Sequence, residues 1–247
     1  MCWSMTASIG MVAAGTAATA IAIHRKAPAA ISIALGYFTI MEALQATGYL
    51  VINDCGGKSN QAITLLSFLH IVFQPFVINA FAMELVPHPV RLRMRRTVFV
   101  LCGLSAGVML LQLMPIQTLG ACRPGDVLCG LRLCLTTGEW HIAWDIPYNG
   151  LLVPFDKLLG THIAFPTYLF TAFILPVVYG AWRFSLMHLL LGPLLAGYLT
   201  GSPNEWPAVW CLFSIGILVI SLSPWIRRRF TTSYWWLWPK AWTTAAG

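Results

Sequence analysis

The stretch AAISIALGYFTIMEALQATGYLVINDCGGKSNQAITLLSFLHIVFQPFVINAFAME, residues 29–84, decides the fold of this chain. It holds two long apolar runs joined by a short polar turn, residues 53–59. A helix of about 20 apolar residues is long enough to cross the hydrocarbon core of a membrane. Both runs also carry polar side chains that hydrocarbon tolerates only at a cost. These are Glu42, Gln45, Tyr49, His70, Gln74 and Asn79.

The composition of the whole chain agrees with a membrane protein. Of its 247 residues, 58% are hydrophobic and only 9% are charged, whereas soluble domains carry about 25% charged residues. The apolar runs are continuous, which favours helices over the alternating strands of a transmembrane β-barrel. We therefore expect an all-α fold, a polytopic membrane helical bundle in which residues 1–247 form a single domain.

About seven transmembrane helices are predicted, with short loops between most of them. A long outer segment, residues 118–160, separates the fourth span from the fifth, and its last part, residues 148–160, is too short to span and is expected in the interface. A Trp-rich tail, residues 226–247, is expected along the cytoplasmic surface. The predicted spans are residues 7–23, 29–52, 60–83, 97–117, 161–182, 184–201 and 206–222.

The basic residues predict the orientation of these spans. Positive charge follows the first span, at Arg25 and Lys26, which places the N-terminus outside and the C-terminus in the cytoplasm. Eleven of the fifteen Lys and Arg residues then lie inside, because the outer side has only Lys58, Arg123, Arg132 and Lys157. The net charge of +7 is therefore attributed to topology. The expected partners are the lipid bilayer and other membrane proteins, not nucleic acid, and the expected location is a bacterial inner (plasma) membrane.

The cysteines fit the same orientation. Five of the seven fall on the predicted outer side, where oxidation is permitted. Cys102 and Cys211 fall within spans and are expected to be inert core residues. We expect at least one disulfide among four outer cysteines, with the pairing left open. These are Cys55, Cys122, Cys129 and Cys134.

Glu42 and His70 are the leading candidates for a functional site. Each lies fourteen residues from Gly56, on either side of the turn, so both are expected at one depth, about 15 Å from the outer ends of their helices. Gln45 and Tyr49 share the helix face of Glu42, and Gln74 shares that of His70. We expect these five residues to bind a small ligand, ion or metal in a site open to the outer side. The alternative is a neutral Glu42 that only joins the two helices by hydrogen bonds.

A second candidate site lies in the outer segment. Glu139, His141 and Asp145 are residue types that bind divalent metals. Their spacing matches no standard ligand motif, and an ordinary polar loop is the competing interpretation. A divalent metal is therefore the one cofactor that the sequence suggests. Retinal is not expected, because none of the lysines lies in mid-span to form a Schiff base. The lysines are Lys26, Lys58, Lys157 and Lys240.

Several short motifs resemble an uncharacterised family of multi-span membrane proteins. They are the start Met1-Cys2-Trp3-Ser4, the pair Met41-Glu42, Asn60, and the pair Gln74-Pro75. The resemblance covers mainly the first 84 residues. It implies about seven spans and draws attention to Cys2, Glu42 and Gln74, but it implies no reaction.

Three functions are consistent with these patterns. The first is a membrane protein that binds a small ligand, ion or metal at an intramembrane polar site. The second is a membrane-embedded enzyme, with Glu42 or His70 as the base and a metal bound to the outer segment. The third is a structural subunit of a larger membrane complex, since Gly- and Ala-rich spans permit close helix packing.

Overall fold

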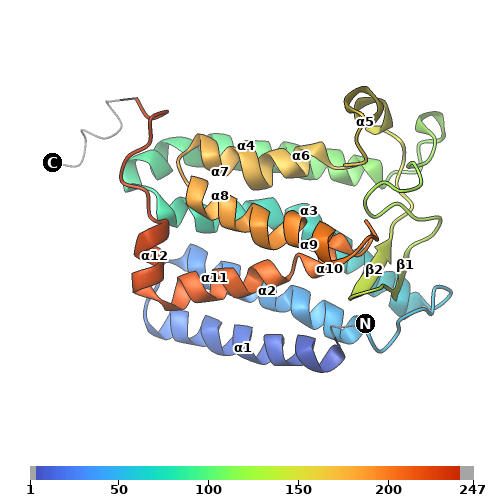
Figure 1. The fold of residues 1–247 in the computed structure, drawn as a ribbon, viewed down its shortest axis with the longest axis horizontal. Coiled ribbons are helices and arrows are strands. Elements are labelled where there is room, and N and C mark those ends of the chain that lie inside the picture. Colours follow the sequence, from blue (N-terminus) through green and yellow to red (C-terminus); the bar gives the residue numbers. More distant parts are fainter. Residues whose placement is uncertain (1–3, 240–247) are drawn as a thin grey trace.

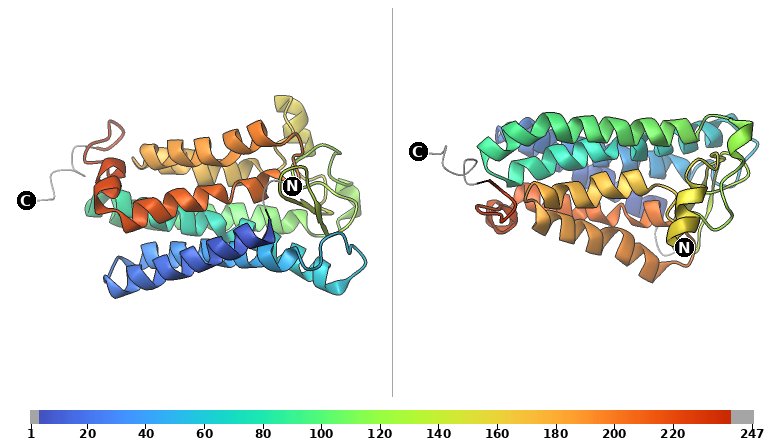
Figure 2. Two further views of the ribbon diagram at one scale, coloured as in Figure 1. Left: turned by 60° about the horizontal axis from the view of Figure 1, so that its bottom comes forward. Right: turned by 90° about the horizontal axis from the view of Figure 1, so that it is seen from above.

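Four long helices form one side of the bundle in the computed structural model, which describes residues 4–239 (Figure 1). Each of these helices is long and apolar enough to cross a membrane. They are packed in sequence order, and α1 and α2 run antiparallel along much of their length (Figure 2). The four helices are α1 (Met5–His24), α2 (Ala29–Gly48), α3 (Lys58–Ala82) and α4 (His88–Gln112).

The start of α4 corrects the predicted fourth span. The arginine-rich stretch after His88 was expected in a loop, but it forms the first turns of this helix. Pro89 lies at the beginning of the helix, where its missing N–H costs nothing. The charged side chains Arg93, Arg95 and Arg96 are exposed there, so the helix extends beyond its apolar part without burying charge.

The remaining long segments of the bundle are interrupted helices. Pro176 and Pro193 lie in or next to the π-helical turns, where proline removes a backbone donor and loosens the regular ladder. The predicted spans at residues 161–182, 184–201 and 206–222 thus correspond to broken rods beside the long helices (Figure 2). The rods are α6 (Pro166–Leu169), η3 (Phe170–Ile174) and α7 (Leu175–Val178); α8 (Trp182–Leu189), η4 (Leu190–Leu194) and α9 (Leu195–Leu199); and α10 (Trp206–Val209) and α11 (Leu212–Leu222).

A small antiparallel sheet departs from the purely helical expectation. Strands β1 (Cys134–Thr137) and β2 (Ile142–Asp145) pair with Cys134 opposite Asp145. Both strands lie in residues 113–165, which we call the covering segment because it lies over one end of the bundle, the hairpin end (Figure 1). The covering segment also holds the short turn η2 (Gln117–Leu119) and the short helix α5 (Val153–Leu159). Several β-branched and aromatic residues favour strand pairing in this polar stretch.

Two disulfides fasten the covering segment, which confirms the prediction that at least one would form among these four cysteines. Cys55 in the turn between α2 and α3 is bonded to Cys134 in β1. Cys122 is bonded to Cys129 within the covering segment itself. The first bond closes a loop across 79 residues, and a cross-link over a long loop removes much entropy from the unfolded chain.

Asn60 reinforces the first of these attachments. This buried residue at the start of α3 donates from Nδ2 to the carbonyls of Val51 (2.8 Å) and Leu135 (2.9 Å). Its Oδ1 accepts from the backbone N–H of Leu135 at 2.9 Å. One side chain therefore satisfies both backbone groups of a residue in β1 and holds the sheet against the helices.

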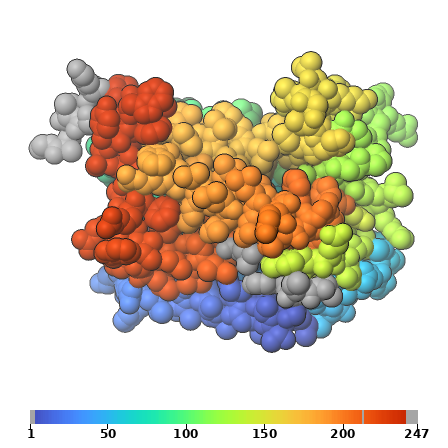
Figure 3. Space-filling view, viewed as in Figure 1, coloured from blue at the N-terminus to red at the C-terminus, as the bar shows by residue number. Residues whose placement is uncertain are grey.

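The other end of the bundle carries the helix α12 (Pro224–Phe230) and the tail that follows it (Figure 3). We call this the arginine end. Trp238 is 7% exposed and donates from its indole to the carbonyl of Tyr179 at 3.1 Å, and a Cβ on Gly180 would lie only 2.5 Å from its ring. Residues 240–247 of the predicted tail, and the predicted motif residue Cys2, lie outside the described residues.

Replacing Asn60 by Ala is expected to destabilise the protein by about 1–3 kcal/mol, because the buried N–H of Leu135 loses its acceptor and the Leu135 carbonyl keeps only the N–H of Asn53 as a donor. Thermal unfolding of the purified protein in detergent measures this change. Ser59→Ala, at the exposed neighbouring position, is the control and should leave the melting temperature near that of the parent. Equal melting temperatures for the Asn60 and Ser59 variants would contradict the role given to Asn60.

Candidate functional site

Glu42 and His70, the predicted pair, are buried in different surroundings. Glu42 lines a small space with Gly15 of α1 and Ser214 of α11. His70 is stacked on Tyr37, with ring centroids 3.8 Å apart. Glu42 Oε2 and His70 Nε2 each have no hydrogen-bond partner among residues 4–239, so they do not bond to each other through these atoms.

The rotation of α2 explains this separation. Tyr37 and Glu42 are five residues apart, which corresponds to about 140° around a helix with 3.6 residues per turn. Tyr37 faces α3, because it stacks on His70 and its hydroxyl donates to the His70 carbonyl. Glu42 therefore faces α1 and α11 rather than α3.

The other predicted ligand-binding residues also have separate partners. Gln45 donates from Nε2 to the sulfur of Cys211 at 2.7 Å. The hydroxyl of Tyr49 lies 3.0 Å from Nδ1 of His141 in the covering segment. Gln74 instead faces a cavity between the helices, which is a further candidate site.

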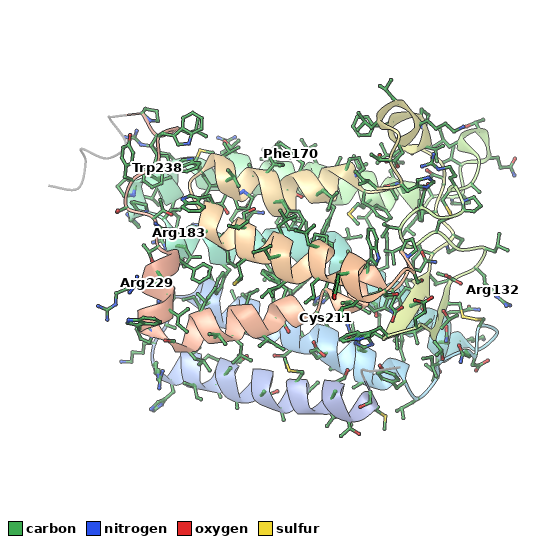
Figure 4. All side chains as sticks on the ribbon, in the orientation of Figure 1. Arg132, Phe170, Arg183, Cys211, Arg229 and Trp238 are labelled. Atoms are coloured by element: carbon green, nitrogen blue, oxygen red, sulfur yellow. A yellow bond between two sulfur atoms is a disulfide. The ribbon has the colours of Figure 1, made fainter. Side chains whose placement is uncertain are left out.

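The cavity has a volume of about 110 Å³ and lies beneath the covering segment. Residues from α2, α3, α4, the broken rods and the covering segment line it, so segments far apart in the sequence meet there. One lining residue, Cys211, is labelled in Figure 4. Most of the lining is apolar or aromatic. Sites for small molecules typically combine such a lining with a few fixed polar groups.

The polar groups of the cavity come from Gln74 and Tyr168. The Tyr168 hydroxyl donates to Gln74 Oε1 at 2.9 Å, and the Gln74 amide nitrogen makes no hydrogen bond within the described part of the chain. Two lining tryptophans direct their indole N–H groups elsewhere: Trp210 to His188 Nε2 at 2.8 Å, and Trp206 to the Thr200 carbonyl at 3.3 Å. A ligand in the cavity would therefore meet apolar ring surfaces and one amide donor.

The covering segment forms the roof of this cavity with two strained turns. Leu128 lines the cavity and has φ of 63°, and Ala164, between the lining residues Ile163 and Phe165, has the same value. Left-handed backbone conformations are costly for residues other than glycine, and they concentrate at ligand sites held by surrounding structure.

Two buried carboxylates fasten the roof, and one of them bonds directly to the turn at Ala164. Asp156 accepts from the backbone N–H groups of Ile163 (3.2 Å) and Ala164 (3.0 Å). Asp126 accepts from the guanidinium of Arg123 at 3.0 and 3.1 Å and lies 2.9 Å from Nδ1 of His162. The roof is thus attached at several points on either side of the cavity.

The predicted metal ligands are not brought together as a set. Glu139 and Asp145 line an open hollow of about 360 Å³ on the surface, whereas the His141 side chain is 1% exposed and directed toward Tyr49. Among residues 4–239, no three His, Cys, Asp or Glu side chains lie close enough to hold a metal ion.

Glu205 organises this region and was not among the predicted site residues. It is fully buried, and its carboxylate accepts from the backbone N–H groups of Glu139 (3.0 Å), Trp140 (2.5 Å) and His141. The Thr200 hydroxyl donates to its second oxygen at 2.6 Å. Three successive backbone donors that surround one carboxylate form an anion-binding nest, and the nest fixes the turn between β1 and β2.

A family model matches residues 6–231 of the chain. The chain belongs to a family of unknown function, DUF5765. The comparisons with curated proteins and with solved structures found no match. Membership of DUF5765 agrees with the resemblance to an uncharacterised family. It assigns no activity, so the function has to be argued from the geometry.

The sequence contained a weak signal for Glu205, which it did not single out. Glu205 is one of only eight acidic residues, and it stands directly before the last predicted span, where a carboxylate favours a helix start. Tyr168 and Trp210 had no such signal, since an aromatic residue within an apolar span is ordinary packing material.

Replacing Glu205 by Gln is expected to destabilise the protein by about 1–3 kcal/mol, because an amide has only one acceptor oxygen for the four donors that the carboxylate satisfies. Gly138→Ala should be similarly damaging, since its Cβ would lie 2.6 Å from the Glu205 carboxyl carbon. Glu139→Gln, on the open surface hollow, is the matched control. Chemical unfolding in detergent measures all three, and a parent-like Glu205→Gln would refute the nest.

Burial in the covering segment lowers the pKa of His141 to about 3. Its Nδ1 accepts from the backbone N–H of Ile142 at 2.8 Å, so the ring proton lies on Nε2. Below pH 6.5 the unfolded chain binds a proton that the folded chain excludes. Stability from this residue is therefore complete above pH 6.5 and is lost as the pH falls toward 3, at up to about 1.4 kcal/mol per pH unit.

The measurement compares the free energy of unfolding of the parent and His141→Asn between pH 7 and pH 5. The parent should lose more stability over this range than the variant, whose side chain does not titrate. Identical slopes would show that His141 is not held neutral.

Proposed function

We propose that the chain is an integral membrane protein that binds a small, mainly apolar molecule with one hydrogen-bond acceptor in the cavity beneath the covering segment. The observation that carries this proposal is the cavity itself, about 110 Å³, with an apolar lining and the amide of Gln74 as its available donor. The strained roof turns at Leu128 and Ala164 support a binding role for this place.

The membrane arrangement is part of the same proposal. The four long helices and the broken rods would together form seven spans, with the hairpin end outside and the arginine end in the cytoplasm. Two disulfides at the hairpin end favour an oxidising side, and the arginines of α4 and α12 favour the cytoplasmic side. A bacterial inner membrane fits this arrangement.

This proposal keeps the small-ligand function suggested by the sequence but moves its site. Gln74 remains a binding residue, joined by Tyr168 and the aromatic wall, whereas Glu42 and His70 lie outside the cavity lining. No described residue favours the enzyme or the complex subunit in the same way.

Cyclohexanone and cyclohexane are suitable probes, because they have similar size and differ in one carbonyl acceptor. We expect the purified protein in detergent to bind cyclohexanone at least several-fold more tightly, as measured by saturation-transfer NMR with competition. Gln74→Leu should remove this preference, since the donor to the carbonyl is lost.

Leu169→Phe, which fills part of the cavity, should weaken the binding of both probes. The control is Leu194→Phe, the same change at a residue that is 54% exposed and outside the cavity lining. Equal affinity for both probes in the parent, or loss of binding only in Leu194→Phe, would overturn the assignment. Melting temperatures show whether each variant is folded.

A further inference from the structure

A second hollow lies on the side of the bundle, far from the covering segment. It is an open groove of about 490 Å³ between α7 and α8, and the tail crosses one end of it. Its lining is almost wholly apolar and includes Phe173, Val177, Leu186 and Leu189. We call it the lateral groove.

Two stacked tryptophans mark the end of the lateral groove nearest the arginine end. Trp182 of α8 and Trp235 of the tail both line it, with ring centroids 6.3 Å apart and planes 21° from parallel. Tryptophan is enriched where a membrane protein passes from the hydrocarbon to the headgroup layer. The groove therefore extends from the hydrocarbon depth of the proposed membrane to its polar boundary.

Arg183 stands at this same end. Its guanidinium lies over the Trp182 ring, 5.1 Å from the centroid, and donates to the carbonyls of Arg229 (3.2 Å) and Thr231 (3.1 Å). Both of these bonds come from one nitrogen, Nη1. A guanidinium has five N–H donors, so the exposed Arg183 keeps donors for an anion.

The surrounding charge is strongly positive. Arg229 of α12 lies near Arg183 (Figure 4), and the same helix carries Arg227 and Arg228. Of the eight acidic residues in the sequence, Glu84 belongs to this end, and it is paired with Arg91. An anion at the mouth of the lateral groove would therefore meet several positive charges, and the one carboxylate at this end among the described residues is already paired.

The groove wall also contains an unsatisfied donor. The indole nitrogen of Trp235 is buried and has no hydrogen-bond partner within residues 4–239. A buried N–H group without an acceptor is costly. An ester or phosphate oxygen of a molecule bound in the groove would offer such an acceptor.

We propose that the lateral groove binds an anionic phospholipid, with one acyl chain along Phe173, Val177 and Leu189 and the phosphate at Arg183. An acyl chain matches the long apolar wall, and the phosphate matches the arginine that ends it. The inference rests on the proposed membrane insertion but not on the cavity beneath the covering segment.

Native mass spectrometry of the full chain released from detergent tests this assignment. The probes are phosphatidylglycerol and phosphatidylcholine with identical acyl chains, added in equal amounts. The parent should retain phosphatidylglycerol at least several-fold more strongly. Arg183→Gln is expected to reduce this preference about fivefold. This variant also loses the two hydrogen bonds to the tail, so its melting temperature is measured to show that it is folded.

The matched control is Arg95→Gln, which removes the same charge at an exposed position of α4. It should leave the preference unchanged, because α4 does not line the lateral groove. Leu189→Trp, which narrows the groove, should reduce the retention of both lipids while the melting temperature shows that the variant is folded.

Three results would overturn the proposal. They are equal retention of the two lipids by the parent, an equal effect of the Arg95 and Arg183 variants, and a lipid-free dimer whose interface is the groove. Failure of the cyclohexanone experiment would not affect these results. Recovery of the chain in the membrane fraction separates a failure of the groove from a failure of membrane insertion.

Discussion

The hairpin end depends on one kind of hydrogen bond, in which a buried side-chain oxygen accepts from backbone N–H groups. The covering segment has little secondary structure of its own, so its backbone donors need partners from elsewhere. Asn60 supplies one for β1, Asp156 supplies one for the turn before α6, and Glu205 supplies one for the turn between the strands. Removing any of these oxygens leaves at least one buried backbone donor without a partner. The disulfides add to this attachment, but they cannot replace it, because a cross-link fixes two points and leaves the backbone between them unsatisfied.

Much of the helical framework could be predicted from the sequence, because apolar length is a local property. The first three spans were placed close to α1, α2 and α3, since apolar runs, loops and helix ends coincide there. The start of α4 was misplaced because charge was taken as a sign of a loop, whereas a helix can continue into water when its arginines are exposed. The β-hairpin was missed because its strands are only four residues long, which is too short for a periodic pattern to appear.

The candidate site was harder to predict, because the position of a side chain depends both on its depth along the helix and on its direction around the helix axis. Counting from Gly56 placed Glu42 and His70 at one depth, but their directions depend on how α2 is rotated. That rotation is set by packing against α1, α3 and α11 together, and no single segment contains this information. The cavity illustrates the same limit. Gln74 could be selected because a polar residue in an apolar run is conspicuous, while Tyr168 and Trp210 became recognisable only when distant segments met around one space.

The two ends of the bundle use their charges in opposite ways. At the hairpin end, the carboxylates of Asp126, Asp156 and Glu205 are buried and consumed by hydrogen bonds of the fold. They hold the covering segment in place, and their own charge is not available to an ion. At the arginine end, Arg183, Arg228 and Arg229 are exposed, and Arg183 uses one nitrogen to hold the tail. A closed site with one amide donor suits a neutral molecule, whereas an apolar groove that ends in exposed guanidinium groups suits an amphiphile with an anionic head. A single charge distribution therefore supports both proposals, because it favours a neutral ligand at the hairpin end and an anionic lipid at the arginine end.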